Sequence, residues 1–150
     1  RTIVTSSPIT IRPALPVDHA PVAGLLRAND LPVEGVPRTM DAFLVAERDG
    51  ALVCAIGLEC YGADALLRSA VVDASVRGTG LGARLVDGII AEAEGRGIGA
   101  LWLLTTTAEG WFPRFGFTVV TRDDVPPVVQ VSREFRGACP SSAIVMRRVR

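Results

Sequence analysis

A glycine-rich segment at residues 77–82, Arg-Gly-Thr-Gly-Leu-Gly, has the residue types of an anion-binding loop. It lies between an apolar segment that ends at Val72 and an amphipathic segment that begins at Leu81. Glycines let the backbone approach a ligand closely, and the first amides of a helix lie unpaired at the positive end of its dipole. The sequence therefore predicts a cradle for a pyrophosphate group, with an ordinary strand-to-helix connection as the alternative.

This segment matches neither of the two common nucleotide-binding loops. The dinucleotide motif GxGxxG has a different glycine spacing, and the P-loop requires a lysine. All 16 basic residues of the chain are arginines, so no lysine is present to grip a phosphate or to form a Schiff base. P-loop NTPases and pyridoxal-phosphate enzymes are therefore excluded.

A guanidinium at Arg68 interrupts an otherwise apolar segment, residues 65–72. Burial of that charge costs free energy unless it is paired. The partner can be a substrate carboxylate held by two parallel hydrogen bonds, or it can be Glu59 on the neighbouring strand. The sequence leaves both alternatives open.

Hydrophobic periodicity predicts the elements that must position these residues. Strands are expected at 9–12, 43–47, 51–59, 65–72, 100–104 and 143–148, and helices from Asp18 to Asn29, from Leu81 until Gly95, at 108–115 and at 128–135. The Asp49-Gly50 pair indicates a hairpin between the second and third strands. The continuously apolar segment 100–104 indicates a strand that runs parallel to 65–72 after the helical crossover. The expected fold is α+β with a mixed sheet.

Composition bounds the class of protein. The 150 residues, 49% of them hydrophobic, fit one domain spanning 1–150. The formal net charge is 0 at pH 7, which argues against nucleic acid and anionic lipid as partners. The apolar stretches are far shorter than the roughly 20 residues of a membrane helix, and the start of the chain lacks a signal-peptide layout. We expect a cytoplasmic protein.

The cysteines do not form a metal-binding pattern. Cys54, Cys60 and Cys139 include no CxxC pair, and His19 is the single histidine. This spacing does not complete a zinc site. We expect free thiols and no metal.

Three motifs in this order resemble the GNAT superfamily of acyl-CoA-dependent N-acyltransferases. The family signature, Arg or Gln followed by xxGxG or xxGxA, matches Arg77, Gly80 and Gly82. Residues 70–73 look like its splayed fourth strand, and residues 111–117 look like its late helix ending in Gly-Phe. The resemblance covers roughly residues 9–148. It implies a single N-acetyltransferase domain whose mixed, mostly antiparallel sheet splays at the CoA site between flanking helices.

A closer resemblance concerns residues 104–112 and the tail in which Ser142 precedes residues 144–146. These segments resemble arsenic-resistance ArsN-type acetyltransferases and the acetyltransferase domain of bacterial N-acetylglutamate synthase. The resemblance implies transfer from acetyl-CoA to the amine of a small amino acid or an amino-acid-like toxin (arsenical, phosphinic or glutamate-like) with a carboxylate. Ser141 stands where the synthase has arginine, which puts a glutamate side-chain site in doubt.

Two other functions stay open from the sequence. The acceptor could be another amine, such as a polyamine, an aminoglycoside or a protein terminus. A member of this family could also bind CoA as a sensor without turnover. Whether the protein forms a homodimer is also open.

The resemblance implies two sets of binding residues. Residues expected to bind CoA are Val71, Val72, Arg77, Gly78, Thr79, Gly80, Leu81, Gly82, Ala83, Thr106 and Phe112. Residues expected to bind the acceptor are Glu34, Arg38, Arg68, Ser69, Thr105 and Ser142.

Enzymes of this family use a base to deprotonate the amine and an acid to protonate the departing thiolate. Glu59 and Glu34 are the candidate bases. Phe112 stands where the family has its usual tyrosine acid, so Tyr61, the single tyrosine, is the candidate acid. A CoA thiolate can also leave without an acid, because a thiol pKa is about 8.5. The structural alternatives are a sheet-edge aromatic at Tyr61 and an ion pair between Glu59 and Arg68.

Overall fold

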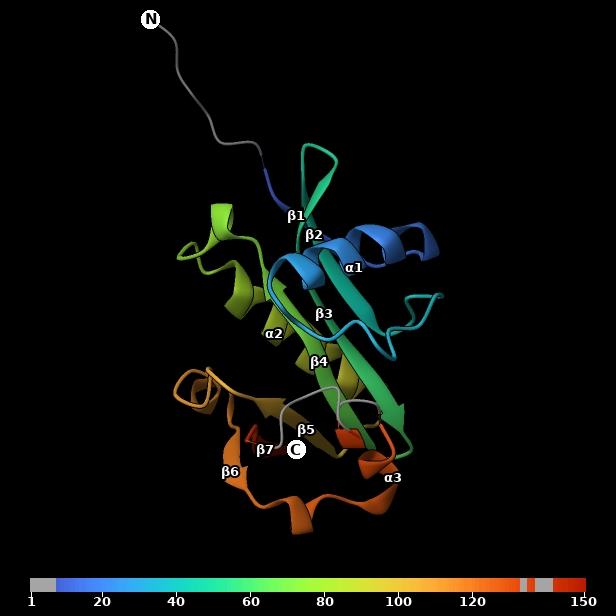
Figure 1. The fold of residues 1–150 in the computed structure, drawn as a ribbon, viewed down its shortest axis with the longest axis vertical. Helices are drawn as coiled ribbons and strands as arrows, with labels where there is room; N and C mark the ends of the chain where they lie inside the picture. Colours follow the sequence, from blue (N-terminus) through green and yellow to red (C-terminus); the bar gives the residue numbers. More distant parts are fainter. Residues whose placement is uncertain (1–7, 133–134, 137–141) are drawn as a thin grey trace, which may run out of the picture.

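The computed structural model describes residues 8–132, 135–136 and 142–150 (Figure 1). These residues form a seven-stranded sheet in the order β1-β2-β3-β4-β5-β7-β6. The strands are β1 (Thr10–Pro13), β2 (Phe43–Arg48), β3 (Ala51–Tyr61), β4 (Asp64–Val72), β5 (Ala100–Thr105), β6 (Thr118–Val120) and β7 (Ile144–Val149). Neighbouring strands pair antiparallel except β4 and β5, which are parallel. The predicted mixed, mostly antiparallel sheet is confirmed.

Helices cover both faces of the sheet (Figure 1). They are α1 (His19–Ala28), α2 (Leu81–Gly95) and the single turn α3 (Pro127–Gln130), with 3-10 turns η1 (Pro16–Asp18), η2 (Ala74–Val76), η3 (Phe112–Phe115) and η4 (Arg122–Asp124). Leu85 and Ile89 of α2 share a buried cluster with Ile56 of β3, whereas Leu26 of α1 shares another with Ala55. Adjacent strand residues point to opposite faces, so α1 and α2 pack on opposite sides of β3.

Local sequence signals agree with the structure at the hairpin and at α2. Asp49 and Gly50 join β2 to β3 with φ angles of 54° and 80°, the positive values that a tight hairpin turn of this type requires. The apolar positions of α2 are buried, as their helical spacing predicts. The sequence therefore specifies the helix that borders the glycine-rich segment.

The sheet splays between β4 and β5. Residues Asp64–Leu66 of β4 pair with Ala100–Trp102 of β5, and the register given for the described residues extends no further along β4. Beyond Leu66, the two strands diverge, as the family resemblance implies.

A β-bulge lies in β4 next to this divergence. Ala55 pairs with Val71, and Gly57 pairs with Arg68, so Ile56 alone opposes two residues of β4. Ser69 is the first of these two and has a φ of 58°. A bulge of this kind bends the strand and re-aims its side chains.

Two predicted helices are wrong in extent. Residues 108–115 contain only η3, because glycine at 110 and proline at 113 interrupt a short segment. The helix expected at 128–135 is interrupted: α3 covers Pro127–Gln130, residues 131–132 form a turn and a bend, and residues 135–136 are again helical, of the π type. Residues 133–134 lie outside the description. Valines at 128, 129 and 131 are poor helix formers, which explains the early end of α3. The strand β6 was not predicted from the sequence, because its three residues are too few to show an alternating pattern.

In the part of the chain that the structure describes, no helix has the length and apolar character that a membrane span requires.

Candidate functional site

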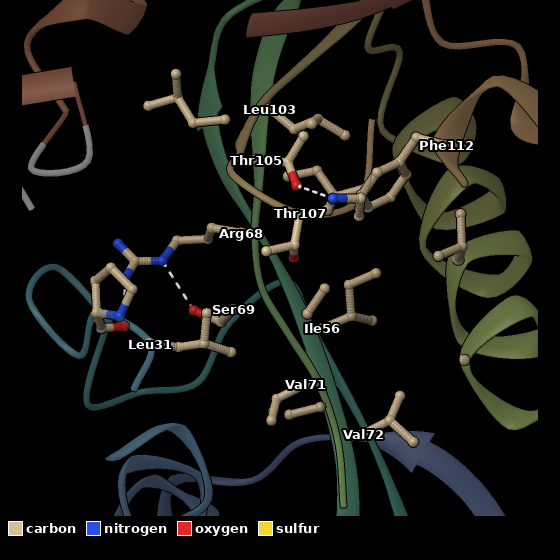
Figure 2. Close-up of a pocket in the computed structure, with 18 of the residues that line it drawn as sticks. Leu31, Ile56, Arg68, Ser69, Val71, Val72, Leu103, Thr105, Thr107 and Phe112 are labelled. Atoms are coloured by element: carbon tan, nitrogen blue, oxygen red, sulfur yellow. Dashed lines mark hydrogen bonds between the residues drawn. The ribbon is translucent and has the colours of Figure 1, made fainter. Parts of the chain in front are cut away.

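A cavity of about 520 Å³ opens where β4 and β5 diverge. Its walls come from β3, β4, β5, the first turns of α2, the loop between α1 and β2, and the segment that follows β5. Predicted site residues that line it are Glu34, Arg68, Ser69, Val71, Val72, Gly82, Thr105, Thr106 and Phe112 (Figure 2). One cavity therefore brings together residues predicted for CoA and residues predicted for the acceptor.

Other predicted site residues do not line this cavity. Arg77, Gly78, Thr79, Gly80, Leu81 and Ala83 form the adjoining loop and the first turn of α2, while Arg38, Glu59, Tyr61 and Ser142 lie elsewhere. Arg38 and Ser142 are exposed, and their roles stay predictions.

The start of α2 borders the cavity with unpaired helical amides. Gly80 caps the helix in the left-handed conformation, at a φ of 82°. The first intrahelical bond runs from Arg84 N to Gly80 O at 3.2 Å, so the amides of Leu81, Gly82 and Ala83 have no acceptor within the helix. Such amides, together with the helix dipole, favour an anionic ligand.

Gly82 allows the helix to approach β4 closely. A Cβ atom at this position would lie 3.3 Å from Val72 Cγ2 and 3.8 Å from the Trp111 ring. A larger side chain at position 82 would therefore occupy space in the cavity next to the start of α2.

Side chains of the glycine-rich segment bond within the protein. Arg77 Nε donates to Val72 O at 3.1 Å, and an Arg77 terminal nitrogen donates to Asn29 Oδ1 at 2.6 Å. Thr79 Oγ1 donates to Val76 O at 2.6 Å. These bonds tie the segment to β4 and to the end of α1, and they leave its backbone as the surface available to a ligand.

An apolar wall continues from the start of α2 into the cavity. It includes Val72, Leu103 and Phe112, and Phe112 packs edge-on against Trp111 with ring centroids 5.0 Å apart. Phe112 is 6% exposed and has no hydroxyl group. This wall suits an alkyl chain and provides no acid at the position where the family resemblance leads one to look for a tyrosine.

The opposite side of the cavity contains a buried guanidinium. Arg68 is 2% exposed and donates to Ser69 Oγ at 2.9 Å (Figure 2). It also donates to Pro32 O at 3.5 Å and to Glu59 Oε1. The structural alternative of an Arg68–Glu59 ion pair is therefore present. Pairing of this kind makes the burial of Arg68 energetically tolerable.

Glu59 and Tyr61 do not line the cavity. Glu59 bonds directly to Arg68, and Tyr61 bonds to Glu59. The Tyr61 hydroxyl donates to Glu59 Oε2 at 2.5 Å, while Glu59 Oε1 accepts from Arg68. Both carboxylate oxygens of Glu59 thus bond to protein groups. Of the two candidate bases, Glu34 is the one that lines the cavity.

Several residues that line the cavity were not predicted from the sequence. Asp30, Leu31 and Pro32 contribute from the loop after α1, and Thr107 and Trp111 contribute from the segment after β5. The run of three threonines after a buried strand is a polar signal that could have identified Thr107, whereas nothing local distinguishes Leu31 from other loop residues.

Two exposed carboxylates, Asp30 and Glu34, lie at the cavity on the same side as the buried Arg68. This side therefore combines a buried cation with exposed anions. The arrangement suits a small molecule that carries charges of both signs, such as an amino acid.

The described cysteines are free thiols. Burial raises the pKa of Cys54 to about 11. Cys139 lies outside the described residues. The described residues contain no group of three or more acidic, cysteine or histidine side chains placed to hold a metal ion.

The acetyltransferase (GNAT) domain family matches residues 40–119, just over half of the chain. The amino-acid acetyltransferase of Ralstonia nicotianae is 35% identical over 91 residues, which cover 59% of this chain and 20% of that protein. Two crystal structures of N-acetylglutamate synthase from Neisseria gonorrhoeae align with 97% of this chain. For the complex with coenzyme A and L-arginine, the TM-score is 0.77, the sequence identity is 25%, and the alignment covers 34% of the synthase chain. For the complex with coenzyme A and N-acetyl-glutamate, the TM-score is 0.79, the sequence identity is 23%, and the alignment covers 36% of the synthase chain.

This chain thus spans about a fifth of the curated relative and about a third of each synthase chain. The matched region includes the glycine-rich segment, the splayed strands and the start of α2. The chain belongs to the GNAT acetyltransferase family.

Proposed function

We propose that this chain is an N-acetyltransferase that moves the acetyl group of acetyl-CoA to the amine of a small amino acid. The observation that carries the proposal is one cavity that joins the start of α2 to a buried arginine. Similarity to amino-acid acetyltransferases supports the choice of acceptor.

The pyrophosphate of acetyl-CoA and the chain that leads from it to the thioester suit two parts of the cavity region. The pyrophosphate would bind the amides at the start of α2, next to Gly80 and Gly82. The apolar wall at Val72 and Phe112 would contact the chain that leads to the thioester. The thioester would then reach the edge of β4 beyond Leu66, where the pairing with β5 has ended.

The transfer itself needs few protein groups. The neutral amine attacks the thioester carbonyl, a C–N bond forms, and the C–S bond breaks to release the CoA thiolate. The amine loses one proton, and Glu34 is the carboxylate we propose to accept it, directly or through water. Because Phe112 has no acidic hydrogen, we propose that the thiolate leaves without an acid from that turn, which a thiol pKa of about 8.5 permits.

We further propose that the acceptor carries an anionic oxygen that Arg68 recognises, with Arg38 and Ser142 as additional contacts. Glutamate-like amino acids and arsenical or phosphinic analogues all carry such an oxygen. The resemblance to ArsN-type enzymes supports the analogues, and the amino-acid acetyltransferase relatives support an amino acid. Exposed carboxylates at Asp30 and Glu34 also favour a second candidate acceptor class, the polyamines.

A panel assay tests this function. Release of free thiol from acetyl-CoA is measured with the protein L-amino acids, a glutamate-like phosphinic acid and a linear polyamine. We expect turnover with at least one amino acid. Binding of acetyl-CoA without thiol release from any amine would contradict the proposal and would favour a CoA sensor.

A matched pair of glycine variants tests the binding mode. Gly80→Val places a side chain at the start of α2 and should weaken acetyl-CoA binding by about tenfold or more in calorimetry. Gly97→Val carries a similar backbone strain, at a φ of 77°, beyond the other end of α2, and should bind normally. Equal affinity in the two variants would refute the pyrophosphate cradle.

A further inference from the structure

Two consecutive residues of β4 face the same side of the cavity. Neighbouring residues of a regular strand point to opposite faces, yet the side chains of Arg68 and Ser69 lie together beside Leu31 (Figure 2). The β-bulge explains this geometry, because Ser69 and the next residue together oppose Ile56. The bulge thus brings a serine hydroxyl next to a buried guanidinium.

The backbone of Ser69 is one that favours glycine. Its φ of 58° lies in the left-handed region, which a residue with a Cβ atom rarely adopts. Glycine would adopt the same conformation without strain, but the chain has serine, and that serine is 9% exposed. Strained residues of this kind are concentrated at functional sites. The strain at Ser69 therefore favours a functional role for its hydroxyl group.

The direction of one hydrogen bond fixes what this hydroxyl can do. A guanidinium has no acceptor, so Arg68 Nε donates and Ser69 Oγ accepts, at 2.9 Å. The hydroxyl retains its own hydrogen, and no acceptor for that hydrogen is found among the described residues. A hydroxyl that accepts a bond from a cation is a stronger donor, and an anionic oxygen is the acceptor that gains most from it.

The guanidinium is itself held in place before any ligand binds. Glu59 Oε1 accepts from one terminal nitrogen, Pro32 O accepts from the other at 3.5 Å, and Tyr61 holds the second oxygen of Glu59. Because these bonds fix the guanidinium, the orientation of Ser69 is set in advance. Preorganisation of this kind reduces the cost of ligand binding.

We propose that Ser69 is a specificity-determining residue whose hydroxyl donates a hydrogen bond to the carboxylate of an α-amino acid acceptor. The inference rests on the proposed acetyl transfer and deepens it. The placement of Arg68 and Ser69 beside Leu31 assigns the hydroxyl to the acceptor, because the apolar wall at Val72 and Phe112 lies on another side of the cavity (Figure 2). Glu59 and Tyr61 are positioning residues for this pair.

The test compares acids with their matching amides. Wild-type protein and Ser69→Gly are assayed with the L-amino acids and the corresponding amino-acid carboxamides, at saturating acetyl-CoA. Glycine removes the hydroxyl and accepts the positive φ. Because a hydrogen bond to a charged group is lost, kcat/KM for the acids should fall about ten- to a hundredfold. The value for the carboxamides should stay within about twofold, since a neutral oxygen gains less from this donor.

Two further variants separate the hydroxyl from the backbone. Ser69→Ala keeps the Cβ atom and the positive φ, and it should lose as much acid selectivity as Ser69→Gly. Asp49→Gly is the matched control, because Asp49 is exposed in the β2–β3 turn with a φ of 54°. It relieves the same kind of strain away from the cavity and should leave all kinetic constants unchanged. Calorimetry should show unaltered acetyl-CoA affinity in every variant.

The outcomes separate this inference from the function on which it rests. Equal losses for acids and carboxamides in Ser69→Gly, or unchanged kinetics, would overturn the role of Ser69 and leave the acetyltransferase standing. Wild-type turnover that shows no preference for acids would do the same. Absence of thiol release from wild-type protein with every amine would instead overturn the proposed function and, with it, the inference.

Discussion

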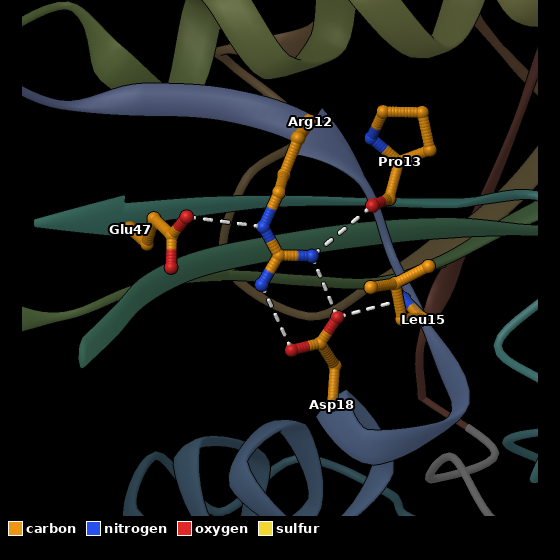
Figure 3. A network of polar contacts seen from close by, with 5 residues as sticks. All are labelled: Arg12, Pro13, Leu15, Asp18 and Glu47. Atoms are coloured by element: carbon orange, nitrogen blue, oxygen red, sulfur yellow. Dashed lines mark hydrogen bonds and ion pairs between the residues drawn. The ribbon is translucent and has the colours of Figure 1, made fainter. Parts of the chain in front are cut away.

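Arg12 and Arg68 both bond to carboxylates, but they lie in regions of the molecule with different roles. Arg12 of β1 donates two hydrogen bonds to Asp18, at 2.7 and 3.0 Å, and a third to Glu47 of β2 at 3.1 Å (Figure 3). Asp18 also accepts from Leu15 N at 2.7 Å. This network ties the edge of the sheet to the turn that precedes α1. Its acidic partners lie on two sides of the guanidinium, so it functions as a structural clasp.

Among the described residues, Arg68 donates to the carboxylate of Glu59, and the hydroxyl of Ser69 lies beside it. Its side chain is 0% exposed, against 26% for Arg12, yet Arg68 lines the cavity and Arg12 does not. The comparison shows that burial and ion pairing alone do not separate a structural arginine from one at a functional site. What distinguishes the two arginines is their surroundings. Arg12 lies between two carboxylates, whereas Arg68 lies beside a serine hydroxyl at an open cavity.

The largest expected effect on activity comes from Arg68→Ala. Loss of a charge-assisted contact should lower kcat/KM for the acceptor about ten- to a hundredfold, with acetyl-CoA affinity unchanged. Arg68→Lys should recover only part of this loss, because a point charge does not reproduce the planar guanidinium. Both variants are assayed well below their unfolding temperatures, since Glu59 loses its buried partner. Reduced stability with normal acceptor kinetics would show that Arg68 has a structural role like that of Arg12, and would contradict its role in acceptor binding.

Arg12→Ala should show the converse result. The side chain of Asp18 is 6% exposed, so removal of Arg12 leaves a nearly buried carboxylate with one remaining backbone donor. We expect the free energy of unfolding at pH 7 to fall by about 3 kcal/mol, measured by urea denaturation. Acceptor kinetics of the folded variant should be unchanged. A selective loss of acceptor affinity would contradict the structural assignment of this network.

The sequence predicts those parts of the molecule that local signals determine. The β2–β3 hairpin follows from Asp49-Gly50, and α2 follows from its apolar periodicity. The glycine-rich segment is recognisable because its function depends on backbone conformation at a helix start. The helix expected at 108–115 is wrong because turn-forming residues outweigh a weak helical pattern.

The acceptor side is less predictable because it depends on pairing between distant residues. The Arg68–Glu59 pair could be anticipated as one of two alternatives, since β3 and β4 form a hairpin. The bulge at Ser69 could not, because it arises from the register between the two strands and has no local signal. The clasp at Arg12 was missed for a similar reason: its acids come from two other elements, and nothing near it in the sequence suggests chemistry.

The pH dependence of stability should sharpen the contrast at the Arg12 network. The hydrogen bond from Arg12 holds the pKa of Asp18 below its ordinary value. A lowered folded-state pKa stabilises the fold at pH values above the unfolded pKa, about 3.9, and the contribution is lost as the pH falls through the folded value. In Asp18→Asn, the unfolding free energy should be lower by about 1–2 kcal/mol at pH 7. The difference from wild type should shrink below about pH 4.

The difference in unfolding free energy between wild type and Asp18→Asn reports on Asp18 alone. Other acids with lowered pKa values, such as Asp41 and Asp73, are present in both proteins. Urea denaturation at pH 7, 4 and 3 measures the unfolding free energy of both proteins. A difference that is constant over this range would mean that ionisation of Asp18 does not contribute to the clasp. Acceptor kinetics at pH 7 should be the same in the two proteins.

The smallest effect is expected from Tyr61→Phe. The Tyr61 hydroxyl donates to Glu59 Oε2, outside the cavity lining, and Glu59 remains held by Arg68 when this hydroxyl is removed. Loss of one hydrogen bond behind the guanidinium should cost about 1 kcal/mol of stability and should change kcat/KM for the acceptor by no more than severalfold. The pH profile of kcat should keep its shape, because a positioning residue does not transfer a proton to the thiolate. A variant that folds, binds acetyl-CoA normally and yet loses turnover and the alkaline limb of its kcat profile would contradict this view. Such a result would make Tyr61 the acid and would place it at the reacting atoms.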